Sequence, residues 1–135
     1  MAKELEVGIK GEARDVVTDL NTAVAYGNTV VNVYASPAMI GLMEKAALSS
    51  VLPFLGEGMT TVGTRFEVKH LAATPVGLNV TARSTLVEIE GKRLLFEVEA
   101  WDDAEQIGKG IHERFIVKLE GFLKRTQSKS TGGQA

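Results

Sequence analysis

The amino-acid sequence predicts an α+β domain in which one antiparallel sheet wraps around a single long apolar helix. Three observations lead to this prediction. Residues 36–55 place apolar side chains at a helical spacing, and after residue 60 the pattern changes to a period of two, which is typical of strands. Short turns join these strands, and strands joined by short turns pair antiparallel. The helix and the sheet can therefore bury each other.

The overall composition limits the classes of function. The chain has 135 residues, the size of one ordinary domain, so we expect one core and one function. A formal net charge of −2 argues against nucleic acid as a partner. The absence of cysteine excludes disulfides, thiolate nucleophiles and cysteine-based metal sites. The first residues are charged and no apolar run is long enough to cross a membrane, so we expect a cytoplasmic protein with no membrane partner.

The expected elements begin with a strand at residues 11–18, which precedes the helix. Ser36 and Pro37 suit the N-cap and N1 positions of that helix, and Pro53 is expected to end it. Apolar side chains occupy most of the helix circumference. The narrow polar strip that remains consists of Gly41, Lys45 and Ser49. A helix of this kind must be wrapped by other parts of the fold.

Four strands are expected after the helix. They span residues 60–70, 79–86, 93–101 and 107–119, with turns at 75–77, 90–92 and 102–105. In the first of them, strict alternation places Val62, Phe66 and His70 on the apolar face. The same alternation places Thr61 and Gly63 on the face exposed to water.

The C-terminal residues 124–135 contain no large apolar side chain, so we expect a disordered tail after a single domain spanning residues 1–123. No second helix is expected to cover the other face of the sheet. A single sheet curled around one helix is the hot-dog arrangement, and a second subunit would commonly cover the outer face of such a sheet.

Three polar residues occupy apolar places in this pattern. The helical neighbours of Glu44 include Ile40 and Leu48, so its carboxylate must be paired, hydrogen-bonded or kept protonated. It could serve catalysis, or it could be a structural carboxylate at a subunit seam or helix edge. His70 continues the apolar face of its strand, where it is either a satisfied core histidine or a catalytic one. Ser36 is explained by helix capping, although a hydroxyl at a helix N-terminus could also hold an acyl oxygen or orient a water.

The spacing of these three residues occurs within a longer pattern. Glu44 follows Ser36 by eight residues, and His70 follows Glu44 by twenty-six. The matching segments are 35–37, 43–47, 61–64, 69–77 and 112–115. Through them the chain resembles the fluoroacetyl-CoA thioesterase-like family of hot-dog proteins, from about residue 10 to residue 122. The match is long and its motifs are specific.

The resemblance implies a hot-dog homodimer that hydrolyses an acyl-CoA thioester with Ser36, Glu44 and His70 as its catalytic group. The characterised family enzyme has Thr where this chain has Ser36, which keeps the hydroxyl. It also has an aromatic-rich lid over the acyl pocket, whereas residues 27–33 here contain no aromatic residue. We expect a small or medium acyl group, with Val33, Ile40 and Met43 lining its pocket; the same homodimer could pair further into a tetramer.

The chemistry of a thioester assigns roles to these residues. Glu44 could attack the carbonyl as a nucleophile or deprotonate a water as a general base, and the sequence leaves both routes open. His70 would orient groups, move protons or protonate the leaving sulfur. Since His112 offers no convincing second metal ligand, we expect no metal, and we expect no cofactor.

Two further positions are candidates for substrate binding. Gly63 could bring a backbone N–H close to the thioester oxygen, or it could only kink its strand. Arg114 could contact a phosphate of CoA, or it could be an ordinary surface charge or half of a cross-strand pair. The competing function is a non-catalytic acyl-CoA-binding hot-dog dimer in which Glu44 and His70 only pair structurally. A hot-dog hydratase is less favoured because no Asp-His pair suits that reaction.

Overall fold

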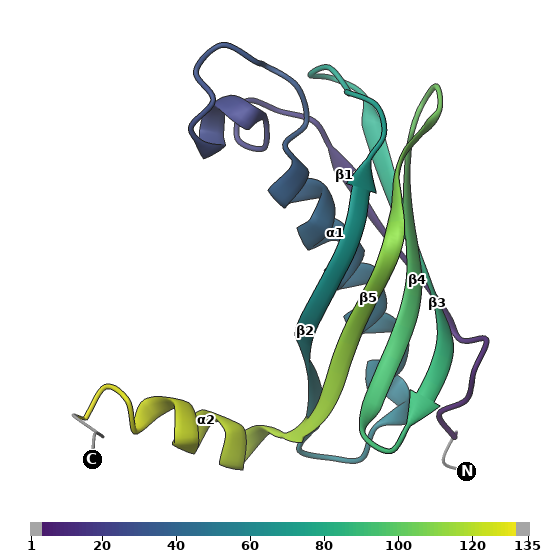
Figure 1. Ribbon diagram of the computed structural model, residues 1–135, viewed down its shortest axis with the longest axis vertical. Helices are drawn as coiled ribbons and strands as arrows, with labels where there is room; N and C mark the ends of the chain where they lie inside the picture. Colours follow the sequence, from purple (N-terminus) through teal and green to yellow (C-terminus); the bar gives the residue numbers. More distant parts are fainter. Residues whose placement is uncertain (1–3, 132–135) are drawn as a thin grey trace.

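The computed structural model describes residues 4–131 and contains one five-stranded sheet curled around one long helix (Figure 1). The strands are β1 (Lys10–Val16), β2 (Met59–His70), β3 (Asn79–Glu90), β4 (Arg93–Asp102) and β5 (Gln106–Lys118). The helices are α1 (Ser36–Val51) and α2 (Leu119–Gln127), with short 3₁₀ helices η1 (Ala23–Tyr26) and η2 (Leu52–Phe54). The expected helix and all five expected strands are present.

The sheet has the strand order β1-β3-β4-β5-β2, and every neighbouring pair is antiparallel. The short turns predicted between β3, β4 and β5 account for the middle of this order, because consecutive strands in hairpins become neighbours. β1 and β2 form the two edges. Along the 12 residues of β2, the edge opposite β5 has no strand partner among the described residues.

The core lies between α1 and the concave face of the sheet. Fully buried side chains from the helix meet fully buried side chains from β3, β4 and β5; they include Met39, Met43, Ala46, Val51, Leu86, Leu94, Phe96 and Ile107. Gly108 allows this close approach, since a Cβ there would lie 2.6 Å from the sulfur of Met39. Gly41, Lys45 and Ser49 are exposed, which confirms the predicted polar strip.

The prediction that Ser36 caps α1 is wrong. Ser36 is the first helical residue, and Ala35 occupies the N-cap position in an extended conformation without a side-chain hydrogen bond. Pro37 is tolerated at the second position because N–H groups of the first turn have no partner within the helix. The Ser36 hydroxyl is therefore free of any capping role.

The predicted facing of β2 is wrong in its first half. A β-bulge between Gly63 and Arg65 adds one residue to β2 opposite β5, and this changes the parity of the strand. Thr61 is consequently buried, with 3% exposure, and a Cβ on Gly63 would point at the helix. After the bulge, Phe66 and His70 face inward as expected.

Residues 124–127, expected to belong to a disordered tail, are helical instead. Helix α2 continues from β5 and runs through residue 127, while residues 132–135 lie outside the described part. Leu119, Phe122 and Leu123 give it an apolar stripe, and basic residues in its last turn complement the helix dipole. In Figure 1, α2 extends away from the sheet. Neither α1 nor α2, the two α-helices of the described residues, is long and apolar enough to span a membrane.

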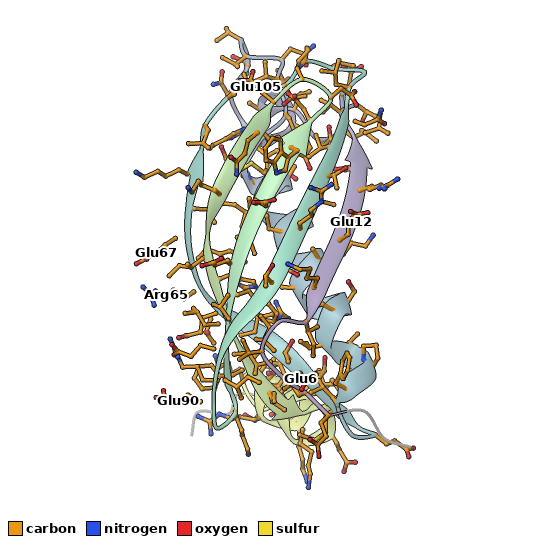
Figure 2. The ribbon with its side chains drawn as sticks, turned by 90° about the vertical axis from the view of Figure 1, so that its right-hand side faces the viewer. Glu6, Glu12, Arg65, Glu67, Glu90 and Glu105 are labelled. Atoms are coloured by element: carbon orange, nitrogen blue, oxygen red, sulfur yellow. The ribbon has the colours of Figure 1, made fainter. Side chains whose placement is uncertain are left out.

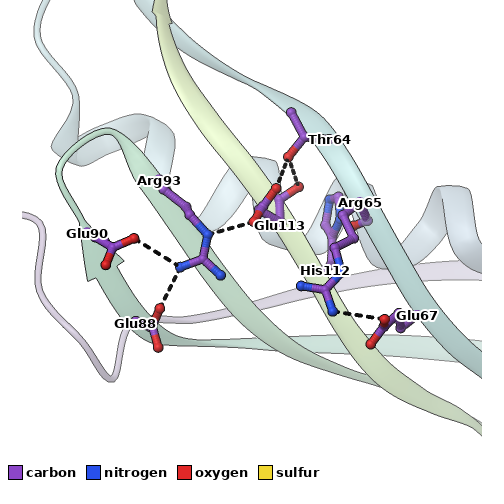
Figure 3. Close-up of polar contacts among 8 residues, drawn as sticks. All are labelled: Thr64, Arg65, Glu67, Glu88, Glu90, Arg93, His112 and Glu113. Atoms are coloured by element: carbon purple, nitrogen blue, oxygen red, sulfur yellow. Dashed lines mark hydrogen bonds and ion pairs between the residues drawn. The ribbon is translucent and has the colours of Figure 1, made fainter.

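The outer face of the sheet is charged. Figure 2 shows Arg65 and Glu67 pointing away from the sheet. Arg65 pairs with Glu67 at 2.8 Å, and Arg93 pairs with Glu88 and Glu113 (Figure 3). Arg93 is thus paired across strands, with residues of β3 and β5, whereas Arg65 pairs with Glu67 on its own strand β2. The apolar interior lies on the other side of the sheet.

Candidate active site

The first residue of α1 meets the last residue of β2. Ser36 Oγ lies 2.7 Å from His70 Nδ1, and this hydrogen bond joins residues that are 34 positions apart in the sequence. The helix start is held in place by backbone hydrogen bonds from Tyr34 N to the carbonyl oxygen of Thr74 and from Ala35 N to that of Asn21. The hydroxyl and the imidazole are therefore positioned together by the fold.

His70 is half-buried, and burial lowers its pKa below the usual value, against the raising effect of a backbone contact with Ala72. Its imidazole is therefore neutral near pH 7. Its Nε2 is buried and makes no hydrogen bond within residues 4–131. A neutral imidazole beside a hydroxyl can accept or pass on a proton, which is the behaviour that acid–base catalysis requires.

A cavity of about 450 Å³ opens beside this pair. Besides Ser36 and His70, the residues that line it are Ala23, Val33, Tyr34, Ala35, Leu71, Ala72 and Ala73. The wall is mostly small and apolar, and the Tyr34 hydroxyl is already hydrogen-bonded to Asp15 at 3.0 Å. The cavity can hold an uncharged organic group.

Glu44 forms a second pair with Arg114. Its Oε2 accepts a hydrogen bond from the Arg114 NH1 group at 3.0 Å, and the two side chains are 42% and 4% exposed, respectively. The carboxylate thus has one fixed partner in the protein interior, while part of it faces solvent. The predicted need of Glu44 for a partner is met by a buried guanidinium.

Arg114 is held in one orientation. Its Nε donates to Thr61 Oγ1 at 2.7 Å, and its NH2 group donates to the Thr61 carbonyl at 2.8 Å. Its NH1 group also lies 3.2 Å from His112 Nε2. A guanidinium fixed on several sides cannot move to a surface phosphate without breaking these bonds. The geometry favours a role in orienting Glu44 over contact with CoA.

Gly63 completes this second group. A Cβ at Gly63 would lie 2.6 Å from Glu44 Oε2 and 3.3 Å from the NH1 atom of Arg114. Any side chain there would displace the carboxylate, so the glycine lets the backbone of β2 approach Glu44 closely.

The candidate residues therefore form two groups instead of one. Ser36 and His70 form the first group, and Glu44, Gly63 and Arg114 form the second. Glu44 follows Ser36 by eight positions in α1, which is a rise of about 12 Å along the helix axis. No hydrogen bond or ion pair found within residues 4–131 links the two groups.

Comparison with known proteins identifies the family. Residues 17–120 match the family model of the fluoroacetyl-CoA-specific thioesterases. A fluoroacetyl-CoA thioesterase of Streptantibioticus cattleyicolor is 42% identical over 101 residues, which cover 75% of this chain and 73% of that protein. The chain belongs to the fluoroacetyl-CoA-specific thioesterase family.

Solved structures agree with this assignment. A variant of the thioesterase FlK in complex with acetyl-CoA superposes with a TM-score of 0.88 at 36% identity, covering 93% of this chain and 98% of that one. A Thermus thermophilus hypothetical protein described as a thioesterase superfamily member gives a TM-score of 0.84 at 30% identity, covering 94% of this chain and 96% of that one. The predicted hot-dog fold and the predicted enzyme class, a thioester hydrolase, are confirmed.

Sequence reasoning missed two residues that hold the second group of this thioesterase in place, Thr61 and His112. Both contact Arg114 and both are buried. Strict alternation from residue 60 placed Thr61 in water, because the bulge after Gly63 leaves no clear mark in the sequence. His112 was considered only as a metal ligand; its place two residues before Arg114, on the same side of β5, was the available signal.

The residues predicted to line the acyl pocket are only partly brought together. Val33 lines the cavity beside Ser36. Met43 is fully buried in the core between α1 and the sheet, and Ile40 does not line the cavity. The thioesterase builds this cavity from the segment before α1 and from the chain that follows β2.

Proposed function

We propose that this thioesterase hydrolyses a small or medium, uncharged acyl-CoA to the free acid and CoA, with Ser36, Glu44 and His70 as its catalytic group. The observation that carries the proposal is the position of Glu44. Its carboxylate is tied to a buried Arg114 on one side and partly open to solvent on the other. A carboxylate held in this way can face a substrate without changing its conformation.

The reaction requires activation of water or of a nucleophile, stabilisation of an oxyanion, and a proton for the departing thiolate. Glu44 either removes a proton from the attacking water or attacks the carbonyl carbon itself, and water then hydrolyses the anhydride. In both routes the bond between the carbonyl carbon and sulfur breaks. His70, with its lowered pKa and its hydrogen bond to Ser36, is suited to move the proton that the sulfur takes up.

The start of α1 and the backbone of β2 offer donors for the oxyanion. Ser36 lies in the first turn of α1, where backbone N–H groups and the helix dipole favour negative charge. Gly63 lacks a side chain, so the Glu44 carboxylate lies directly against its backbone. We assign Gly63 to substrate binding and Arg114 to holding Glu44 in place.

The protein acts as a homodimer in this proposal. Within one chain Glu44 and the Ser36–His70 pair lie too far apart to act on one carbonyl. The unpaired edge of β2 carries exposed backbone groups that a second copy could satisfy by continuing the sheet. The outer face of the sheet is charged, which argues against a dimer through that face. Pairing through β2 would bring Glu44 of each chain toward the Ser36 and His70 of the other.

The wall of the cavity supports the substrate class. Apart from His70, none of its lining residues carries an ionisable group that is free, because the Tyr34 hydroxyl is engaged by Asp15. An acyl group with its own carboxylate would find no fixed counter-charge among these residues. Small apolar acyl groups fit the alanine and valine lining.

The test is the release of free thiol from acetyl-, butyryl-, isobutyryl-, benzoyl-, fluoroacetyl- and succinyl-CoA. Wild type is compared with Glu44→Gln and with the matched control Lys45→Gln, which changes the exposed neighbour of Glu44. Hydrolysis of uncharged esters that falls by about 10²- to 10⁴-fold in Glu44→Gln alone would support the proposal.

Three other outcomes would contradict the proposed function or its substrate class. Unchanged turnover in Glu44→Gln would remove Glu44 from the chemistry, and preference for succinyl-CoA would overturn the substrate class. Saturable binding of acyl-CoA without turnover of any ester would favour the non-catalytic acyl-CoA-binding dimer.

A further inference from the structure

His112 is a fully buried histidine on β5 with a fixed tautomer. Its Nδ1 lies 2.9 Å from the backbone carbonyl oxygen of Arg65. A carbonyl oxygen only accepts hydrogen bonds, so Nδ1 carries the proton of the neutral ring. The Nε2 atom then presents a lone pair, and it can only accept.

The atom that Nε2 faces is the NH1 nitrogen of Arg114, at 3.2 Å. The same nitrogen donates to Glu44 Oε2 at 3.0 Å. One NH1 group has two hydrogens, so it can satisfy His112 with one and Glu44 with the other. His112 and Glu44 thus accept hydrogen bonds from the same Arg114 nitrogen.

The plane of the imidazole ring is fixed as well. The ring of Phe66 stacks on it at a centroid distance of 3.8 Å and an interplanar angle of 8°. The stacking partner comes from β2 and is in register with His112 across the β2·β5 pair. The lone pair of Nε2 is therefore aimed at Arg114 by the sheet itself.

We propose that His112 is a positioning residue, which holds the Arg114 guanidinium so that its NH1 group orients the Glu44 carboxylate toward the substrate. The inference rests on the proposed function, because it gives Glu44 its orientation for hydrolysis. His112 acts through Arg114 and does not touch the acyl-CoA.

Protonation of His112 would break this arrangement. Burial lowers the pKa of His112 and Arg114 lowers it further, whereas the Arg65 carbonyl and the carboxylates of Glu44 and Glu113 act in the opposite direction. The charged groups come from α1 and β5, whereas β2 contributes the neutral carbonyl of Arg65 and β4 the ring of Phe96. Once protonated, Nε2 would turn an N–H toward the guanidinium, and donor would face donor beside a like charge. Activity should then fall at low pH through the loss of the Arg114 orientation.

Two variants distinguish the effect of the Nε2 hydrogen-bond acceptor from the effect of the stacked ring. His112→Phe keeps a ring to stack on Phe66 and removes the acceptor, whereas His112→Gln places an amide oxygen near the position of Nε2 and cannot be protonated. We expect kcat to fall on the order of 10- to 100-fold in His112→Phe with KM changed less than about 3-fold. His112→Gln should restore most of kcat at pH 7.5, and its activity should fall less steeply below pH 6.5 than that of wild type.

A double-mutant cycle with Glu44→Gln tests whether His112 acts through Glu44. If it does, His112→Phe has little further effect on kcat in the Glu44→Gln background. Multiplicative losses would overturn the inference, as would wild-type kcat in a folded His112→Phe. If this variant does not fold, the pH dependence of His112→Gln decides, and a profile identical to wild type overturns the inference.

An activity-independent measurement keeps the two proposals distinguishable. The side-chain Nε–H signal of Arg114 in an NMR titration should move with the protonation of His112 in wild type and stay constant in His112→Gln. A constant signal in wild type overturns the His112 contact, whatever the enzymatic result. Titration of the signal without hydrolysis of any ester would instead place the failure in the proposed function.

Discussion

The Oγ atom of Ser36 lies 2.7 Å from Nδ1 of His70, so the first residue of α1 is joined to the last residue of β2. The same serine makes no side-chain hydrogen bond to the helix that it begins. A residue type that usually serves helix stability is therefore available for chemistry here. Both residues line the cavity, so a group bound there would contact them.

Replacing Ser36 should separate activity from stability. We expect Ser36→Ala to lower kcat on the order of 100-fold, because His70 loses its partner, and Ser36→Thr to retain most activity. Since Ser36 does not cap α1, the free energy of unfolding should change by less than about 0.5 kcal/mol, below the ~1 kcal/mol typical of a lost cap. Urea unfolding and thiol release measure both quantities. A destabilised Ser36→Ala with full activity would contradict the assignment.

Adding a methyl group at Gly63 should affect the orientation of Glu44. The new Cβ would lie 2.6 Å from Oε2 of Glu44, so the carboxylate must move, and we expect Gly63→Ala to lower kcat on the order of 100-fold. Gly41→Ala is the matched control, because Gly41 faces open space on α1. It should stabilise the helix by about 0.5–1 kcal/mol and leave kcat unchanged. Equal activity of the two variants would show that the contact with Glu44 does not matter.

A site shared between two subunits predicts recovery of activity on mixing. Glu44→Gln and His70→Asn should each be inactive as homodimers, whereas their co-expressed mixture should regain roughly a quarter of wild-type activity, since mixed dimers contain one intact site. Glu44→Gln mixed with Arg114→Lys should regain none, because both changes fall in the same half of each site. Absence of recovery in the first mixture, with mixed dimers present by mass spectrometry, would place the whole site within one chain.

Stability should decrease as the pH falls below the ordinary histidine pKa. Burial lowers the pKa of both His70 and His112 in the folded protein, so the unfolded chain binds protons more readily than the folded one. The free energy of unfolding is therefore highest above pH 6.5, and it decreases as the pH falls through the lowered pKa values of the two histidines in the folded protein. Urea unfolding at pH 7.5, 6.5 and 5.5 should show this decrease, with a smaller one in His112→Gln. A free energy of unfolding that stays constant over this range would be inconsistent with both assignments.

Much of the fold could be predicted because it depends on local patterns. The helical spacing between Met39 and Val51 requires a helix buried on most sides, and the period of two after residue 60 requires a sheet to wrap it. The candidate site could be predicted only as a set of residue types. Glu44 and His70 stood out because polar side chains among apolar neighbours need partners, and the resemblance to a family joined them with Ser36 into one catalytic group.

The sequence by itself determined the family, the wrapped helix and the need of Glu44 for a partner. Only the tertiary structure decided that the partner is Arg114, 70 residues away, and that Thr61 and His112 hold it. A single bulge at Gly63 turns Thr61 inward, and the register between β2 and β5 places Phe66 against His112. Periodicity in a sequence reports which side of an element is apolar, whereas contacts between distant residues depend on strand register, which one extra residue can reverse.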